Sequence, residues 1–281
     1  MEYREFQPHP RLRPWVALIW TFELDDRLGF GPPERILPDG IVELIFHWGD
    51  PFMMAFAGEA PARQPRSFAL AQTRRFVEIA PAGRSGFISV RFRHGGGCHF
   101  MRPPVSSFAD GLVGTRDLWG AQALALETDL GEARSAGTRV RLVERFLLDQ
   151  LARHYKPDVD RLASALWQRD GYGRVSELCR DLGVGERRLE RTARAALGLS
   201  PKQALSLGRF LRACALLRRA APKGLADIAL ACGYYDQAHF HGDFKRLSGM
   251  TPKQFAADRS VAVLDPDGVS DSSNPPHGAP G

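Results

Sequence analysis

A row of arginines between residues 186 and 197 is the part of the sequence best suited to a specific chemistry. The segment reads ERRLERTARAAL, and helical spacing would turn one of its faces inward and leave the other free. A guanidinium fork pairs bidentately with phosphate oxygens and with the edge of a guanine base. The side chains on the free face are Arg187, Arg188, Glu190, Arg191 and Arg194. This pattern predicts a helix that binds nucleic acid through both phosphates and bases.

A second segment, 236–247, carries a related set of side chains. Its free face would hold Gln237, His239, Gly242, Lys245 and Arg246. A glutamine amide suits an adenine edge, whereas a Lys–Arg pair near the end of a helix is better placed to neutralise phosphates. We therefore expect Gln237 to contribute to base recognition and the two cations to contribute affinity.

Both segments belong to a near-duplication about fifty residues apart. The first copy, 178–203, reads LCRDLGVGERRLERTARAALGLSPKQ, and the second, 228–254, reads IALACGYYDQAHFHGDFKRLSGMTPKQ with one residue inserted. The matching positions are Gly183 and Gly233, Leu189 and Phe240, Gly198 and Gly249, and the tetrapeptides 200–203 and 251–254. An ordered set of matches at one spacing indicates a repeated supersecondary unit.

Each copy has the pattern of a helix-turn-helix unit. A short helix is followed by a glycine that permits a left-handed turn, and then by a second helix, here called the reading helix, which would enter the major groove. The predicted supporting helices are 175–182 and 225–232, and the predicted reading helices are 186–197 and 236–247. Leu189 and Phe240 would face inward and hold each reading helix against its supporting helix.

Residues 203–220 (QALSLGRFLRACALLRRA) join the two units as one predicted helix. At about 1.5 Å per residue, this helix would be roughly 25 Å long. Such a spacer could place the units on successive major grooves, which repeat every ~34 Å along the duplex. Its four arginines either contact phosphates or belong to a plain structural linker. The phosphate candidates of the whole region are Arg188, Arg194, Arg209, Arg212, Lys245 and Arg246.

Charge and composition agree with a polyanionic partner. The 281-residue chain has a net charge of +6, and residues 158–259 hold eighteen Lys and Arg against eleven Asp and Glu. A solubilising surface would give the same excess, so charge alone does not decide. The four cysteines form no C-x-x-C pair, residues 1–12 show no secretory leader, and no apolar run reaches the length of about eighteen residues that a membrane span needs. We expect a cytoplasmic protein without a membrane partner.

The N-terminal part of the sequence predicts strands. Short apolar runs alternate with Gly and Pro from residue 14 to about residue 103, as in WVALIWTFEL, GIVELIFHW, FVEIA and GFISVRF. Their close spacing favours an antiparallel barrel or sandwich, and 121–155 has a helical pattern. The predicted fold class is α+β, with a β-rich, barrel-like domain that ends in helix and then an all-α domain with two helix-turn-helix motifs. The predicted domains are 1–157, regulatory, 158–260, carrying both units, and 261–281, a disordered tail.

Residues 158–257 resemble the DNA-binding domain of the AraC/XylS family of bacterial regulators. The resemblance is carried by GRFLRACALLRR and by GLADIALACGYYDQAHFHGDFKRLSGMTPKQF. It implies an all-helical, monomeric domain that binds double-stranded promoter or operator DNA and commonly activates transcription by touching RNA polymerase. The base-reading positions that it implies are Arg187, Glu190, Arg191, Gln237, Ala238 and His239.

Three positions depart from the family pattern. Gly185 stands where a Ser or Thr cap is usual and Ala193 stands where an aromatic residue is usual, so the first unit is expected to be less firmly held. Gly242 replaces the arginine of many relatives, which weakens the expectation of base contact there. The N-terminal segments RILPDGIVELIFHWGD and FISVRFRHGGGCHFMRPPVSSFADGLVGTRDLWG resemble a small-barrel sensor domain found in a subset of the family. That resemblance implies a ligand-responsive or interaction domain and leaves any small-molecule effector undefined.

Several other residues have side chains that could bind a ligand or react, but each also has a simpler structural interpretation. His94, Cys98 and His99 could ligate a metal, but their spacing matches no compact metal signature, so we expect neither metal nor cofactor. Asp39 or Glu43 could hold a cationic ligand at the barrel mouth, although 38–40 is more simply a turn. A catalytic barrel fused to the DNA-binding part is the alternative function, with Cys98 as its candidate reactive thiol. A further alternative is that the repeat serves contacts with other proteins instead of DNA. Of these functions, we expect a DNA-binding regulator without enzymatic activity.

Overall fold

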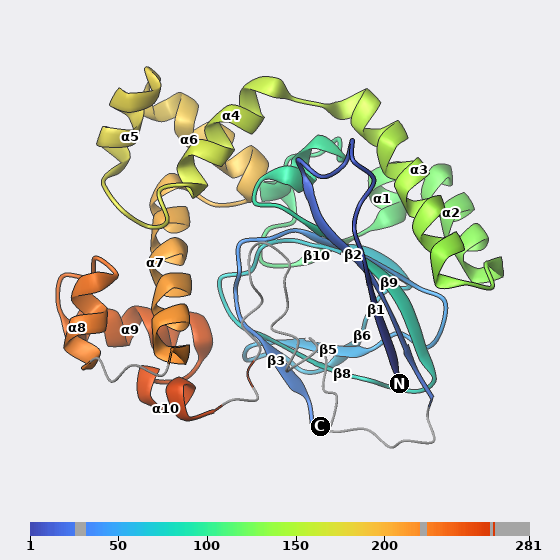
Figure 1. The fold of residues 1–281 in the computed structure, drawn as a ribbon, viewed down its shortest axis with the longest axis horizontal. Helices are drawn as coiled ribbons and strands as arrows, with labels where there is room; N and C mark the ends of the chain where they lie inside the picture. The colour runs from blue at the N-terminus through green and yellow to red at the C-terminus, as the bar shows by residue number, and fades with distance from the viewer. Residues whose placement is uncertain (26–31, 220–223, 259–260, 262–281) are drawn as a thin grey trace.

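The computed structural model describes residues 1–25, 32–219, 224–258 and 261, and it consists of a strand-rich part followed by a helical part (Figure 1). The strands are β1 (Glu2–Phe6), β2 (Val16–Leu24), β3 (Glu34–Ile36), β4 (Glu43–His47), β5 (Met53–Phe56), β6 (Ala62–Arg63), β7 (Ser67–Leu70), β8 (Val77–Ala80), β9 (Ser85–Phe92) and β10 (Leu112–Gly114). Strands and helices are thus largely segregated along the chain. The predicted α+β fold class is confirmed.

The strands form two antiparallel sheets. The larger sheet has the order β1-β2-β9-β4-β7-β10 and the smaller has the order β3-β8-β5-β6. A cluster rich in aromatic residues fills the space between them, with Phe22 and Phe87 from the larger sheet packed against Phe52, which precedes the smaller sheet's β5. Because each sheet covers the inner face of the other, the strand-rich part has the barrel-like character that the alternating pattern predicts.

Strand β9 is buried along its whole length because both of its faces are covered. Successive side chains of a strand point to opposite faces. In the neighbouring strand β4, Leu44 and Phe46 belong to the cluster on the helical side, whereas Ile45 belongs to the cluster between the sheets. Helices must therefore cover the outer face of the larger sheet.

Three helices lie next to this sheet, namely α1 (Thr115–Trp119), α2 (Ala121–Glu132) and α3 (Ala136–His154). The helical pattern predicted over 121–155 corresponds to two helices, α2 and α3. The break falls at Ser135, whose side chain accepts the backbone N–H of Thr138 and so caps α3. Val143 and Leu147 of α3 are fully buried, which shows that the helix is held by its apolar face.

The helical part carries the two predicted units. Its helices are α4 (Pro157–Trp167), α5 (Val175–Leu182), α6 (Glu186–Leu197), α7 (Pro201–Arg218), α8 (Leu225–Ala231), α9 (Gln237–Ser248) and α10 (Pro252–Ala257). Helix α7 begins two residues before the predicted spacer because Ser200 and Gln203 form a capping box around Pro201. The predicted disordered tail, 261–281, lies outside the described residues except for Val261.

The strand-rich and helical parts share one hydrophobic core, which extends from the outer face of the larger sheet into the C-terminal helices. The 3-10 helices η2 (Gly96–His99) and η3 (Val105–Ser107) pack against α6. Gly95 permits a close approach to α4 as well, since a Cβ at that position would lie 2.8 Å from the Cβ of Ala163. Within the described part of the chain, every helix is too short or too polar to cross a membrane.

Candidate nucleic-acid interface

The first helix-turn-helix unit consists of α5 and α6, and both have the bounds predicted from sequence. Gly183 ends α5 in the left-handed conformation (φ 64°), and Gly198 ends α6 in the same way (φ 71°). Glycine adopts this conformation without the steric penalty of a Cβ. Leu189 is fully buried, so α6 is fixed by its inner face as predicted.

The outer face of α6 is open to solvent. Arg187, Arg188, Arg191 and Arg194 are exposed, and Glu190 is half-buried. Arg194 Nε donates to Glu190 Oε1 at 2.7 Å, and Arg188 Nη2 donates to Asp158 Oδ2 of α4 at 3.5 Å. Among the described residues, neither Arg187 nor Arg191 forms an ion pair. These two guanidinium groups can therefore meet DNA without first breaking an internal contact.

The second unit consists of α8 and α9. Asp236 caps α9, because its Oδ1 accepts the backbone N–H of His239 at 2.7 Å. The reading helix therefore begins and ends one residue later than predicted. Phe240 is fully buried, as the matching Leu189 is in the first unit, while Gln237 is exposed. Gly249 ends the helix with φ 74°.

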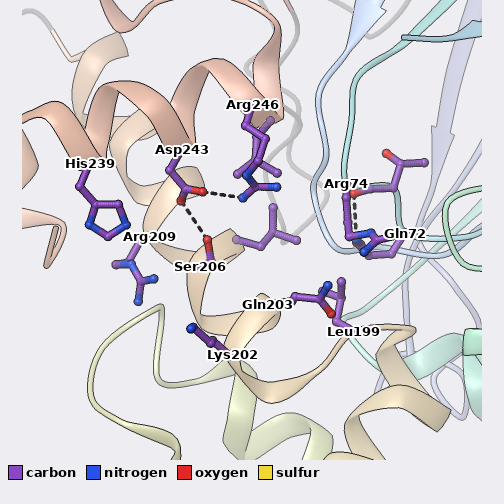
Figure 2. A pocket seen from close by; sticks show the side chains of 13 residues that line it. Gln72, Arg74, Leu199, Lys202, Gln203, Ser206, Arg209, His239, Asp243 and Arg246 are labelled. Atoms are coloured by element: carbon purple, nitrogen blue, oxygen red, sulfur yellow. Dashed lines mark hydrogen bonds and ion pairs between the residues drawn. The ribbon is translucent and has the colours of Figure 1, made fainter. Parts of the chain in front are cut away.

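One flank of α9 lines a cavity. His239, Asp243 and Arg246 follow each other at helical spacing and line this cavity together with residues of α7 (Figure 2). Asp243 Oδ2 accepts the hydroxyl of Ser206 at 2.9 Å. Gln237 and Ala238 are exposed and do not line the cavity. The exposed residues of α9 thus divide between an outer face and this flank.

Arg209 and Arg212, the two phosphate candidates in the spacer helix α7, differ in the contacts that their side chains make. The Arg212 side chain is 12% exposed, bonds to the Asp170 carboxylate at 2.5 Å and lies over the Tyr172 ring at 3.5 Å. These contacts favour the structural-linker interpretation at Arg212. Arg209 lines the cavity with the flank of α9 and donates from Nη1 to Gly171 O at 3.3 Å.

The same cavity contains two cations that the sequence analysis did not single out. Lys202 lies in the first turn of α7, and Arg74 lies in the loop between β7 and β8, on the opposite side of the cavity (Figure 2). Lys202 belongs to the repeated Ser/Thr-Pro-Lys-Gln tetrapeptide, whose regular form indicates only a helix start. Arg74 stands in no motif, so folding alone brings it to this site.

The residues considered for metal or thiol chemistry are His94, Cys98 and His99, and in the structure they are buried or in contact with other side chains. Burial raises the pKa of the Cys98 thiol to about 12, so little of the reactive thiolate exists at neutral pH. His94 stacks on Trp167, and His99 Nε2 lies 3.3 Å from Asp160 Oδ1. The described residues contain no group of three or more His, Cys, Asp and Glu side chains arranged to hold a metal ion.

The two carboxylates considered for a cationic ligand accept hydrogen bonds from different groups in the structure. Asp39 Oδ2 accepts Arg91 Nη2 at 2.6 Å, and its Oδ1 accepts the backbone N–H of Ile41 at 3.0 Å, which is a turn contact. Glu43 lines a small cavity of about 30 Å³ between the sheets and accepts the indole N–H of Trp20 at 3.3 Å. Asp39 is thus engaged by Arg91, whereas Glu43 faces a cavity.

These features define a protein with two helix-turn-helix units behind a strand-rich domain. Residues 178–258 match the family described as a helix-turn-helix domain, and residues 4–114 match a domain of unknown function (DUF6597). The HTH-type transcriptional activators RhaR of Yersinia pseudotuberculosis and Yersinia pestis are 34% identical over 106 residues, 36% of this chain and 36% of their own. The C-terminal helix-turn-helix domain is thus similar to that of AraC/XylS-family transcription regulators. The match spans about a third of the length of these curated relatives.

Solved structures give weaker similarities. ToxT from Vibrio cholerae aligns over 92% of this chain and 98% of its own, with 10% identity and a TM-score of 0.43. A transcriptional regulator from Chromobacterium violaceum with an AraC-type DNA-binding domain aligns over 36% of this chain and 90% of its own, with 26% identity and a TM-score of 0.33.

Proposed function

We propose that this chain is a sequence-specific DNA-binding transcription regulator in which α6 and α9 enter successive major grooves of an operator or promoter. The observation that carries the proposal is that each reading helix buries one apolar face and leaves basic or polar side chains exposed on the other. Phosphate neutralisation would provide most of the affinity, and base contacts would provide the choice of sequence.

The proposed contacts follow the exposed faces of the two helices. The base-reading residues are Arg187, Glu190 and Arg191 in α6 and Gln237, Ala238 and His239 in α9. The phosphate-binding residues are Arg188, Arg194, Arg209, Lys245 and Arg246. Arg191 is the strongest candidate for a bidentate guanine contact because it is exposed and, among the described residues, forms no ion pair.

The N-terminal domain, 1–157, would regulate the DNA-binding domain, 158–260. Support comes from the packing of η2 and η3 on α6, because a change in the strand-rich part would reach the first reading helix directly. A small-molecule effector and RNA polymerase are the further partners that this function proposes. The site of action would be the bacterial nucleoid in the cytoplasm.

Selection of bound sequences from a random duplex library with the full chain tests this function. The expected result is a motif with two half-sites about one helical turn, ~10 base pairs, apart, because each unit would occupy one major groove. Retention of duplex without any enriched sequence would contradict sequence-specific reading. Failure to retain any duplex at low salt would favour a protein-interaction role for the repeat.

A further inference from the structure

A cavity of about 350 Å³ lies between the loop after β7 and the helices α7 and α9. Figure 2 shows Lys202 and Arg209 on α7, His239 and Arg246 on α9, and Arg74 on the opposite wall. Asp243 is the carboxylate among the residues that line this cavity. Cations therefore outnumber carboxylates on its walls by four to one before His239 is considered.

Two of these cations are already paired. Arg246 Nη2 lies 2.5 Å from Asp243 Oδ1, and Arg74 Nε donates to Asp110 Oδ2 at 2.5 Å. The carboxylate on the wall is consequently used by Arg246. The excess positive charge of the cavity falls on Lys202 and Arg209.

Lys202 and Arg209 stand seven residues apart on α7, so they lie on the same face of that helix. Within the described chain, neither forms an ion pair with a carboxylate. Lys202 is exposed, which leaves its ammonium group free to meet a ligand.

Arg209 is held in place with donor capacity unused. Its guanidinium lies 5.7 Å from the centre of the Tyr234 ring, and its Nη1 donates to Gly171 O at 3.3 Å. Its Nε is buried and has no hydrogen-bond partner among the described residues. The Arg209 guanidinium is thus a fixed cation beside a hollow, and such a group favours an oxyanion there.

We propose that this cavity binds a phosphate group, with Lys202 and Arg209 as its principal ligands and Arg74 closing the site from the strand-rich domain. Guanidinium and ammonium groups are the usual protein partners of phosphate oxygens. The phosphate belongs either to the DNA backbone between the two units or to a free phosphorylated molecule. Only the first of these sources rests on the proposed function.

An occupied site would link the two parts of the chain. Arg74 belongs to the strand-rich part, whereas Lys202 and Arg209 belong to the helix that joins the two units. A ligand that contacts both sides binds best to the arrangement in which they are close. Binding would thus stabilise one position of the loop after β7 relative to the second unit.

The first experiment uses the full chain with pyrophosphate and AMP as free probes, measured by calorimetry at low ionic strength. If the source is a free molecule, Lys202→Gln and Arg209→Gln should each weaken probe binding by about tenfold or more, the scale of a lost charged hydrogen bond. Lys202→Arg should retain binding, and Arg145→Gln, at an exposed position of α3 outside the cavity, should change nothing. Thermal unfolding of each variant verifies that it is folded.

The second experiment measures the salt dependence of binding to a random duplex. If the source is DNA, the probes do not bind, and the Lys202→Gln/Arg209→Gln variant lowers the slope of log K against log salt by about one unit per lost phosphate contact. Insensitivity of both measurements to these substitutions, or an equal effect of Arg145→Gln, overturns the proposal. A wild-type chain that binds pyrophosphate but no duplex would refute the regulator function and retain the phosphate site.

Discussion

The imidazole of His94 stacks on the indole of Trp167, with ring centroids 3.5 Å apart and planes inclined by 14°. His94 Nε2 also lies 2.9 Å from the carbonyl oxygen of Asp39, so the turn at 38–40 is tied to the same contact. Trp167 is the last residue of α4, the first helix of the C-terminal part. The strand-rich part therefore contacts the helical part at the C-terminal end of α4.

The Gly40→Ala variant tests the contact between the turn at 38–40 and Trp167. Gly40 has φ +79°, and a Cβ there would lie 2.8 Å from Trp167 Cη2 and 3.1 Å from Leu207 Cδ2. We expect a loss of about 1–3 kcal/mol in the free energy of unfolding, from backbone strain and from the clash. Urea unfolding followed by tryptophan fluorescence measures it. Gly58→Ala is the matched control, because Gly58 has φ +85° but open space around its Cβ position. An equal loss in both variants would show that the contact itself contributes nothing.

The Arg191→Ala variant should weaken binding to the selected operator by about 1–3 kcal/mol, the scale of one bidentate base contact. Binding to random duplex should fall much less, because the lost contact would be to a base. Electrophoretic mobility shift with both duplexes measures the difference. Arg145→Ala provides the control for a general loss of positive charge. A parallel loss on both duplexes would assign Arg191 to a phosphate.

The Lys245→Ala variant should weaken binding to every sequence by a similar factor. Lys245 is exposed in the last turn of α9, where phosphate contact is the proposed role. The slope of log K against log salt should flatten by about one unit. Titrations of operator and random duplex at several salt concentrations test this. A loss confined to the operator with an unchanged slope would contradict the assignment.

Stability should fall in mild acid because of His47. Burial lowers the pKa of His47 from 6.5 to about 4, against the opposing effect of its hydrogen bond with Gln64. As the pH falls, His47 is therefore protonated near pH 6.5 in the unfolded chain but only near pH 4 in the folded chain. The free energy of unfolding should drop by about 3 kcal/mol as pH falls through this window. Urea unfolding at pH 7 and pH 4.5 tests it, and His47→Leu should flatten the change whereas His9→Leu, at an exposed position, should not.

The signals that predicted the helix-turn-helix units are local in the chain. Gly183 and Gly198 adopt left-handed conformations that end α5 and α6, and Leu189 is buried at the predicted inner position. Helical periodicity and caps act over four or so residues, so sequence alone shows them. Asp236, which the predicted helix counted as its first residue, is instead the cap that precedes α9.

Short strands gave weaker signals. β3, β5 and β6 have between two and four residues, too few to show an alternating pattern. Their pairing partners lie elsewhere in the chain, as with Glu34 opposite Ile79. The sequence therefore predicted a barrel or sandwich without its strand order.

The sequence by itself determined the two units, their reading helices and the chemistry of their exposed side chains, because those depend on residues within a few turns of one another. Only the tertiary structure decided that Arg212 is held by Asp170, that Asp39 is engaged by Arg91, and that Arg74 shares a cavity with Lys202. Each of these contacts joins residues far apart in the chain. Their partners are chosen by tertiary packing, and no local pattern encodes that packing.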